Sequence, residues 1–135
     1  MNSKFDILNT AKQSIKNQGD AILNLSKFIN KEFENSVNAI HCIKGRVIVS
    51  GVGKSAIIGK KIAATFNSTG TPAIFMHAGE AIHGDLGVVQ KDDIIILISK
   101  SGNTAEIKNL VPFLKKTHVK LIAISSDKNS FLGMN

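Results

Sequence analysis

The amino-acid sequence predicts an α/β domain with a doubly wound parallel sheet and additional helices at its N-terminus. Short apolar segments alternate with helical patterns along most of the chain, which is the order of an open parallel sheet with helices on its faces. The apolar segments are continuous rather than alternating, so both faces of the sheet should be covered. At 135 residues the chain has room for one domain, predicted over 1–135.

The first third of the sequence predicts helices. One amphipathic helix is expected over 20–44, where apolar residues recur at steps of mostly three and four, and Gly45 should end it. Its apolar residues are Ile22, Leu25, Phe28, Ile29, Phe33, Val37, Ile40 and Ile43. A shorter helix should precede it, with Phe5, Leu8, Ala11 and Ile15 on one side.

Four strands are predicted after Gly45. They are RVIVS (46–50), PAIFM (72–76), DIIILIS (93–99) and VKLIAIS (119–125). Helical patterns follow the first strand, as far as about Thr69, and the third strand, over 105–118. Pro112 should kink or restart the latter helix. The loop HAGEAIHGDLG (77–87) exceeds the length of about two to six residues usual in α/β units, so we expect it to do more than connect.

Two polar turns should meet at the carboxyl edge of the sheet. GVGKS (51–55) follows the first strand and SKSGNT (99–104) follows the third. In a flavodoxin-like strand order these two strands are neighbours at the point where the winding reverses, and ligands bind in such crevices. We therefore expect the turns to face each other across one crevice.

The first turn favours a plain phosphate over a nucleotide cofactor. A Walker loop needs Gly five residues before Gly53, where Ile48 stands. A dinucleotide fingerprint survives as Gly51, Gly53 and Ala56, but that pattern is weak. His77 also occupies the place where an acidic residue should hold a ribose.

The second turn predicts an anion site more directly. Ser99, Ser101 and Thr104 place three hydroxyls at a helix N-terminus, where free backbone N–H groups and the helix dipole favour a negative charge. The alternative is purely structural: Asn103 caps the helix and Glu106 completes a capping box. That alternative leaves the serines unexplained.

The charge and composition narrow the partners. The chain has 17 Lys and Arg against 10 Asp and Glu, a net charge of +7 that attracts anions. There is no Trp or Tyr for base stacking and the lysines are scattered, so we expect no nucleic-acid partner. No apolar run reaches the roughly 18 residues of a membrane span, and no membrane partner is expected. The one cysteine, Cys42, excludes an internal disulfide framework, fits a cytoplasmic location and should be a buried thiol.

On these motifs the sequence resembles the SIS (sugar isomerase) domain of the arabinose-5-phosphate isomerase family. The resemblance runs from about Ile43 to Ile124 and is carried by GVGKS, STGTPAIFMHAGEAIHGDLG (68–87) and ISKSGNTAEI (98–107). The histidine-containing loop is its specific part, since the serine turn alone would indicate only the wider SIS group. The sequence departs from the family at Ala78, Lys100 and Asn103, where members often have Pro, Asn and Glu.

The resemblance implies an aldose–ketose isomerase that converts D-ribulose 5-phosphate to D-arabinose 5-phosphate through an enediol or enediolate, for Kdo and lipopolysaccharide synthesis. The alternatives are a non-catalytic sugar-phosphate-binding module and an isomerase for another ketose phosphate. No cofactor is required. By similarity Lys54, as a buried amine, and Glu106, as a desolvated carboxyl, are the catalytic residues.

Further site residues follow from the same resemblance. Those expected to hold the phosphate are Ser55, Ser99, Ser101 and Thr104. Gly70 and Thr71 match a substrate-contact segment, although Gly70 alone would be interpreted as a helix C-cap. His77 and His83 should contact sugar hydroxyls; an ordered turn without chemistry and a divalent metal at His83 are the second and third alternatives.

SIS domains of this kind have a fifth strand and further helices, which carry the remaining catalytic acid and histidine. We therefore expect the sequence to be C-terminally truncated and to lack the last strand and helices, with an intact small binding module as the alternative. The 135 residues alone should be inactive. No CBS module is expected within them, and the family resemblance implies a homo-oligomer, specifically a tetramer.

Overall fold

The computed structural model describes residues 6–135, which fall into two compact units divided after Val37. The first unit holds helix α1 (Ile7–Asn24), the short 3₁₀ helix η1 (Leu25–Phe28) and the first residues of α2 (Lys31–His41). Of the residues assigned to the first predicted helix, Phe5 lies outside the described residues. The other three lie in α1.

The single helix expected over 20–44 is wrong, because the backbone leaves the helical conformation between η1 and α2. Ile29 is extended, with φ −75° and ψ 105°. The Oδ1 atom of Asn30 then accepts a hydrogen bond from the backbone N–H of Phe33 at 3.1 Å. An Asn side chain in this position satisfies a donor that a new helix leaves free, so Asn30 starts α2 as a separate element.

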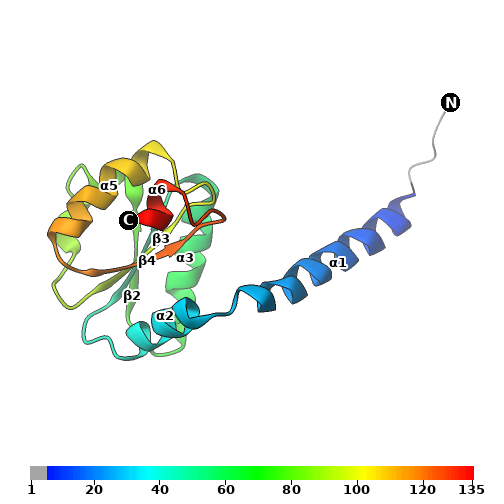
Figure 1. The fold of residues 1–135 in the computed structure, drawn as a ribbon, viewed down its shortest axis with the longest axis horizontal. Helices are drawn as coiled ribbons and strands as arrows, with labels where there is room; N and C mark the ends of the chain where they lie inside the picture. Colours follow the sequence, from blue (N-terminus) through cyan, green and yellow to red (C-terminus); the bar gives the residue numbers. More distant parts are fainter. Residues whose placement is uncertain (1–5) are drawn as a thin grey trace. The chain divides into compact units, whose positions relative to one another are not determined.

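The second unit is built on four parallel strands in the order β2-β1-β3-β4. Figure 1 labels β2, β3 and β4 of this sheet and shows helices beside it. The strands are β1 (Val47–Gly51), β2 (Ala73–His77), β3 (Ile94–Ile98) and β4 (Lys120–Ile124). This is the predicted flavodoxin-like order, and every predicted strand is present with each of its bounds shifted by one residue. The first and third strands are neighbours, as a switch point between them requires.

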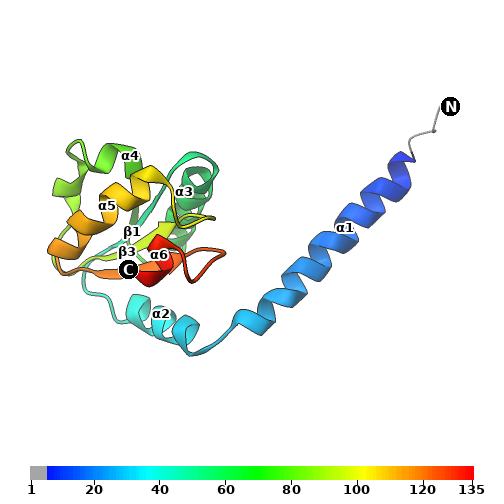
Figure 2. The ribbon, with the colours of Figure 1, turned by 45° about the horizontal axis from the view of Figure 1, so that its top comes forward.

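Helices cover both faces of the sheet, as the continuous apolar strands predicted (Figure 2). The covering helices are α3 (Gly53–Ser68), α4 (Ala78–Ala81), α5 (Ala105–Lys116) and α6 (Phe131–Met134). Ile48, Ile95 and Leu97 point to the face packed by α4, α5 and α6. Val47 and Val49 point to the other face, where α3 and the end of α2 pack.

Three local features differ from the sequence-based expectation. The segment 77–87 is not an open loop, because it contains α4 and the start of a 3₁₀ helix, η2 (Asp85–Val88). Helix α5 continues through Pro112, which lies on its exposed side, where water can bind the carbonyl that loses its N–H partner. Cys42 is exposed rather than buried, since it lies at the exposed end of α2.

An ion pair fixes the amino edge of the sheet. The Arg46 guanidinium donates to Asp93 Oδ2 at 2.9 Å, and the Arg46 backbone N–H donates to Asp93 Oδ1 at 2.8 Å. Asp93 is only 4% exposed. Burial alone would raise the pKa of Asp93, but the hydrogen bonds from Arg46 and from the Gln90 N–H, with the Arg46 charge, outweigh it and hold the pKa below 3.8.

The strand β4 is at an edge of the described sheet. Its outer positions are exposed, and Ile124 keeps 48% of its surface accessible. None of the helices over residues 6–135 is long and apolar enough to cross a membrane.

Candidate functional site

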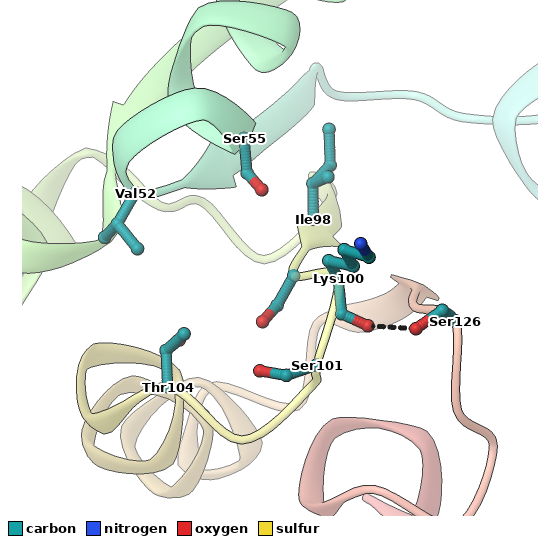
Figure 3. A pocket seen from close by; sticks show the side chains of 8 residues that line it. Val52, Ser55, Ile98, Lys100, Ser101, Thr104 and Ser126 are labelled. Carbon is teal, nitrogen blue, oxygen red and sulfur yellow. Dashed lines mark hydrogen bonds between the residues drawn. The ribbon is translucent and has the colours of Figure 1, made fainter.

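A cavity of about 370 Å³ opens at the carboxyl ends of β1 and β3. Its lining is rich in hydroxyl groups and contains no acidic side chain. The lining residues are Val52, Ser55, Ile98, Ser99, Lys100, Ser101, Thr104 and Ser126. The two turns predicted to converge therefore do so, and Figure 3 shows Ser55 and Ser101 on opposite sides of one cavity.

The first wall is the turn between β1 and α3. Gly53 begins α3 with φ +55°, a backbone conformation that suits glycine, and the helix starts two residues after β1 ends. Gly51 lets the turn lie close to β3, since a Cβ there would lie 3.1 Å from the Ile98 carbonyl oxygen. Ser55 is the third residue of α3, so its hydroxyl lies beside the N–H groups that the first helical turn leaves free.

The second wall is the turn between β3 and α5. Ser99 is 3% exposed, and its carbonyl and hydroxyl oxygens both accept from the Gly102 N–H at 3.1 Å. Gly102 has φ +64°, and a Cβ there would collide with Ser130. The turn is thereby held tightly, with the hydroxyls of Ser99 and Ser101 at the cavity.

The capping-box alternative is wrong. The N-cap residue of α5 is Thr104, and the Asn103 side chain makes no hydrogen bond to the helix start. Asn103 instead donates to the Ser101 carbonyl oxygen at 3.0 Å and accepts from the Phe131 N–H at 3.1 Å. Thr104 makes no side-chain cap bond either, and its buried Oγ1 has no hydrogen-bond partner among the described residues. This hydroxyl is free to bind a ligand.

A third wall comes from the segment after β4, which sequence reasoning missed. The Ser126 hydroxyl donates to the Lys100 carbonyl oxygen at 2.6 Å (Figure 3). The Ser126 N–H donates to the same oxygen at 3.0 Å. Ser126 follows the carboxyl end of β4, which is paired with β3. The rule that ligands bind beyond the carboxyl ends of parallel strands could have identified it, had it been applied to the fourth strand.

Both predicted catalytic residues flank the cavity without lining it. Lys54 is the second residue of α3, directly before the lining residue Ser55. Glu106 is the second residue of α5, two residues after the lining residue Thr104. Lys54 is exposed, so the expectation of a buried lysine is wrong for this structure, while Glu106 is half-buried. Both residues therefore lie next in the sequence to the cavity walls, but the structure does not place either side chain in the cavity lining.

Gly70 and Thr71 lie at the opposite edge of the sheet, before the start of β2. Gly70 has φ +88°, and its N–H donates to the Asn67 carbonyl oxygen while the Thr71 N–H donates to that of Phe66. This pair of bonds is a Schellman motif that ends α3. The structure thus supports the C-cap interpretation of Gly70 and does not bring either residue to the cavity.

The two histidines are also placed apart from the cavity lining. His77 ends β2 and pairs in register with Gly51 at the end of β1, which brings it to the correct edge of the sheet. It is half-buried, and its Nδ1 is buried without a hydrogen-bond partner in the described part of the chain. His83 is exposed, just beyond α4.

The residues around His83 do not fit a metal site. Nowhere in residues 6–135 do three or more His, Cys, Asp or Glu side chains gather in a way that could hold a metal ion. A zinc ion in a protein usually takes three or four protein ligands, drawn from such groups.

Comparison with known proteins extends these observations. The family model for the SIS domain matches residues 39–135. The arabinose 5-phosphate isomerase KdsD of Yersinia pestis is 45% identical over 128 residues, covering 95% of this chain and 39% of that protein. Its namesake in Escherichia coli K12 is 44% identical over 129 residues, covering 96% and 39%. The chain therefore spans about two fifths of the length of these curated relatives.

Among solved structures, Escherichia coli CFT073 c3406 in complex with arabinose 5-phosphate has a TM-score of 0.90 and 44% sequence identity. The match covers 99% of this chain and 71% of that chain.

Proposed function

The chain belongs to the SIS domain family, and from that premise we propose that the cavity binds the phosphate group of an open-chain sugar phosphate. The observation that carries this proposal is the convergence of two helix N-termini, with four serine or threonine hydroxyls from the two turns, on one cavity without an acidic side chain. Free N–H groups at helix starts favour an anion, and hydroxyls donate to its oxygens. The residues assigned to the phosphate are Ser55, Ser99, Ser101 and Thr104.

The substrate proposed is D-ribulose 5-phosphate, isomerised to D-arabinose 5-phosphate by the complete protein. Support comes from relatives named arabinose 5-phosphate isomerases at 44–45% identity, and from a neighbour solved in complex with the proposed product. Isomerisation of another ketose phosphate is the second candidate. A non-catalytic binding module is the third, favoured by the exposure of Lys54.

The reaction moves protons between two carbons. A base removes a proton from C1 of the ketose while the C2 oxygen takes up a proton, giving an enediol. Protonation of C2 and loss of the C1 hydroxyl proton then give the aldose. Glu106 is proposed as the base and Lys54 as the cation that stabilises charge on the developing enediolate oxygen. A phosphate fixed by the neighbouring hydroxyls would orient the reacting carbons toward both residues.

The remaining assignments belong to the same proposal. His77 is proposed to contact sugar hydroxyls, supported by its place at the carboxyl edge of the sheet beside β1. His83, Gly70 and Thr71 would have to act from outside the cavity, and we assign them substrate contact on the family resemblance alone. We further propose that the complete protein is a cytoplasmic homo-oligomer, specifically a tetramer as the family resemblance implies. It would supply Kdo and lipopolysaccharide synthesis and need no cofactor.

The binding half of the proposal is tested by calorimetry on the complete protein with ribulose 5-phosphate, ribulose and NAD in separate titrations. We expect binding of the phosphorylated sugar and much weaker binding of the other two. Comparable affinity for unphosphorylated ribulose, or clear NAD binding, would refute a phosphate site.

The catalytic half is tested with Glu106→Gln in the complete protein. Glutamine keeps the size of the side chain but cannot accept the C1 proton, so turnover should fall by about a hundredfold or more. Because no capping box involves Glu106, the melting temperature and the affinity for ribulose 5-phosphate should change little. Retained turnover would remove Glu106 from the mechanism.

A further inference from the structure

Lys100 is the one charged side chain among the residues that line the cavity. It is exposed, and its ammonium group makes no ion pair or hydrogen bond with any described residue. We propose that Lys100 is a specificity-determining residue that supplies a positive charge to the phosphate of the bound sugar. The inference rests on the proposed function in one respect only, that the cavity is the phosphate site.

Hydrogen bonds hold the backbone of Lys100 in place, so its Cα and Cβ atoms stay at the cavity wall. Its carbonyl oxygen accepts three hydrogen bonds, from the Ser126 hydroxyl at 2.6 Å, the Ser126 N–H at 3.0 Å and the Ser125 hydroxyl at 3.2 Å. On either side of it, Ser99 and Ser101 also line the cavity. The side chain therefore starts from a fixed point on the cavity wall and varies only in its own rotamers.

A charge at this position adds something that the other lining groups cannot supply. Ser and Thr hydroxyls and helix N–H groups are neutral donors, which also bind uncharged sugar hydroxyls. An ammonium group interacts more strongly with the phosphate dianion than with a neutral group, and hydrogen bonds between charged partners are the stronger kind. Since no carboxylate lines the cavity, nothing there neutralises Lys100.

The exposure of Lys100 limits the size of the effect and gives it a signature. Interactions between exposed charges are screened by salt over about 10 Å at 0.1 M ionic strength. The contribution of Lys100 should therefore be largest at low salt and small at high salt. A merely structural role would not depend on salt in this way.

The test compares two variants that lose the same charge. Lys100→Gln removes it at the cavity, and Lys120→Gln removes it at the amino end of β4, at the opposite edge of the sheet. Calorimetry on the complete protein measures ribulose 5-phosphate affinity at about 20 mM and about 500 mM salt. We expect Lys100→Gln to weaken binding by roughly three- to tenfold at low salt and far less at high salt. Lys120→Gln should lose much less affinity than Lys100→Gln at low salt and should match the wild type at high salt.

A third variant, Lys100→Arg, keeps the charge and should restore most of the low-salt affinity. Equal affinities for Lys100→Gln and Lys120→Gln, with wild-type binding intact, would overturn the role of Lys100 and leave the phosphate site standing. An absence of ribulose 5-phosphate binding by the wild type would overturn the proposed function itself, and the Lys100 inference with it. A uniform loss at both salt concentrations would also overturn the inference, since it would indicate a structural effect.

Discussion

Thr104 is a helix N-cap residue whose side chain does not make the usual capping hydrogen bond. A threonine at this position ordinarily accepts a hydrogen bond from the second or third N–H of the helix, and losing it costs about 1 kcal/mol. Thr104 makes no such bond, and its Oγ1 is buried without a partner among the described residues. A buried hydroxyl without a partner costs free energy in the folded state, so we expect its role to be in ligand binding.

Thr104→Val tests this role, because valine keeps the shape and removes the hydroxyl. We expect the free energy of ribulose 5-phosphate binding to the complete protein to weaken by about 1.5–3 kcal/mol, the range of a hydrogen bond to a charged group. Thermal stability should stay the same or rise, because valine removes a buried hydroxyl that has no hydrogen-bond partner. Thr117→Val is the matched control, since Thr117 lies at the other end of α5 and donates to the Leu114 carbonyl oxygen at 2.6 Å. The control should lose stability and keep affinity; the reverse pattern would contradict the assignment.

Ser50 shows where residue-level reasoning from the sequence stops. Its hydroxyl is fully buried on β1 and has no partner within the described residues. The sequence gives no sign of this, because Ser50 simply continues an apolar strand. By contrast, the hydroxyls of Ser99, Ser101 and Thr104 were predictable, since each lies where a strand ends and a helix begins.

At the scale of elements, the turn over 99–104 (the serine turn) is held by hydrogen bonds from the segment that follows β4. The Leu132 N–H donates to the Gly102 carbonyl oxygen at 3.0 Å, and the Phe131 N–H donates to Asn103 Oδ1 at 3.1 Å. Helix α6 thus holds the turn from outside the cavity. The sequence could not reveal this, because a contact between residues 103 and 131 depends on the pairing of β3 with β4 and not on any local pattern.

Asn103→Ala removes the bond that the Phe131 N–H donates to hold this turn, together with the Asn103 side-chain bond to the Ser101 carbonyl oxygen inside the turn. We expect amide hydrogen exchange at Phe131 and Leu132 to accelerate, stability to fall by about 0.5–1.5 kcal/mol and phosphate affinity to fall with it. Asn129→Ala is the control, since Asn129 is exposed on the same segment and its side chain makes no hydrogen bond to any described residue. If Asn103→Ala left hydrogen exchange at both amides unchanged, the bond between Asn103 and Phe131 would not stabilise this segment.

The helices and strands were predicted unequally well. The buried strands were found because each is a continuous apolar run bounded by polar turns. The prediction of one helix over 20–44 was wrong because the apolar periodicity continues across Ile29 and Asn30, whereas the helical backbone does not. The Asn30 side chain caps a new helix instead. The four-residue helices α4 and α6 are too short to show a period at all.

At the scale of the whole sheet, the carboxyl and amino edges have different roles. The carboxyl edge holds the cavity, and the amino edge is fixed by Arg46 and Asp93. These two residues directly precede Val47 and Ile94, which are partners in the register of β1 and β3. The ion pair therefore joins the strands that carry the two turns lining the cavity, and it does so far from the cavity. Sequence reasoning missed it because it follows from strand register.

The pH dependence of unfolding should report this pair. The pKa of Asp93 is held below 3.8 in the folded state, so the folded protein binds its proton less readily than the unfolded chain does. The stabilisation is fully present above the unfolded pKa of about 3.9 and is lost as the pH falls through the lower folded pKa. Asp93→Asn should lower the free energy of unfolding at pH 7 by about 1.5–3 kcal/mol, the range of a hydrogen bond to a charged group.

As the pH falls below about 3.9 the gap between wild type and Asp93→Asn should narrow, because the unfolded wild-type chain takes up the proton first; the gap stops narrowing once the folded carboxyl is also neutral, below its lower pKa. Denaturant unfolding of both proteins from roughly pH 2.5 to pH 7 measures this difference. Asp92→Asn is the matched control, since Asp92 is the exposed neighbour and uses only its backbone carbonyl to bind the Gly45 N–H. A gap for Asp93→Asn that stayed constant across the whole pH range would show that the loss comes from packing, and that the charge of Asp93 does not stabilise the sheet.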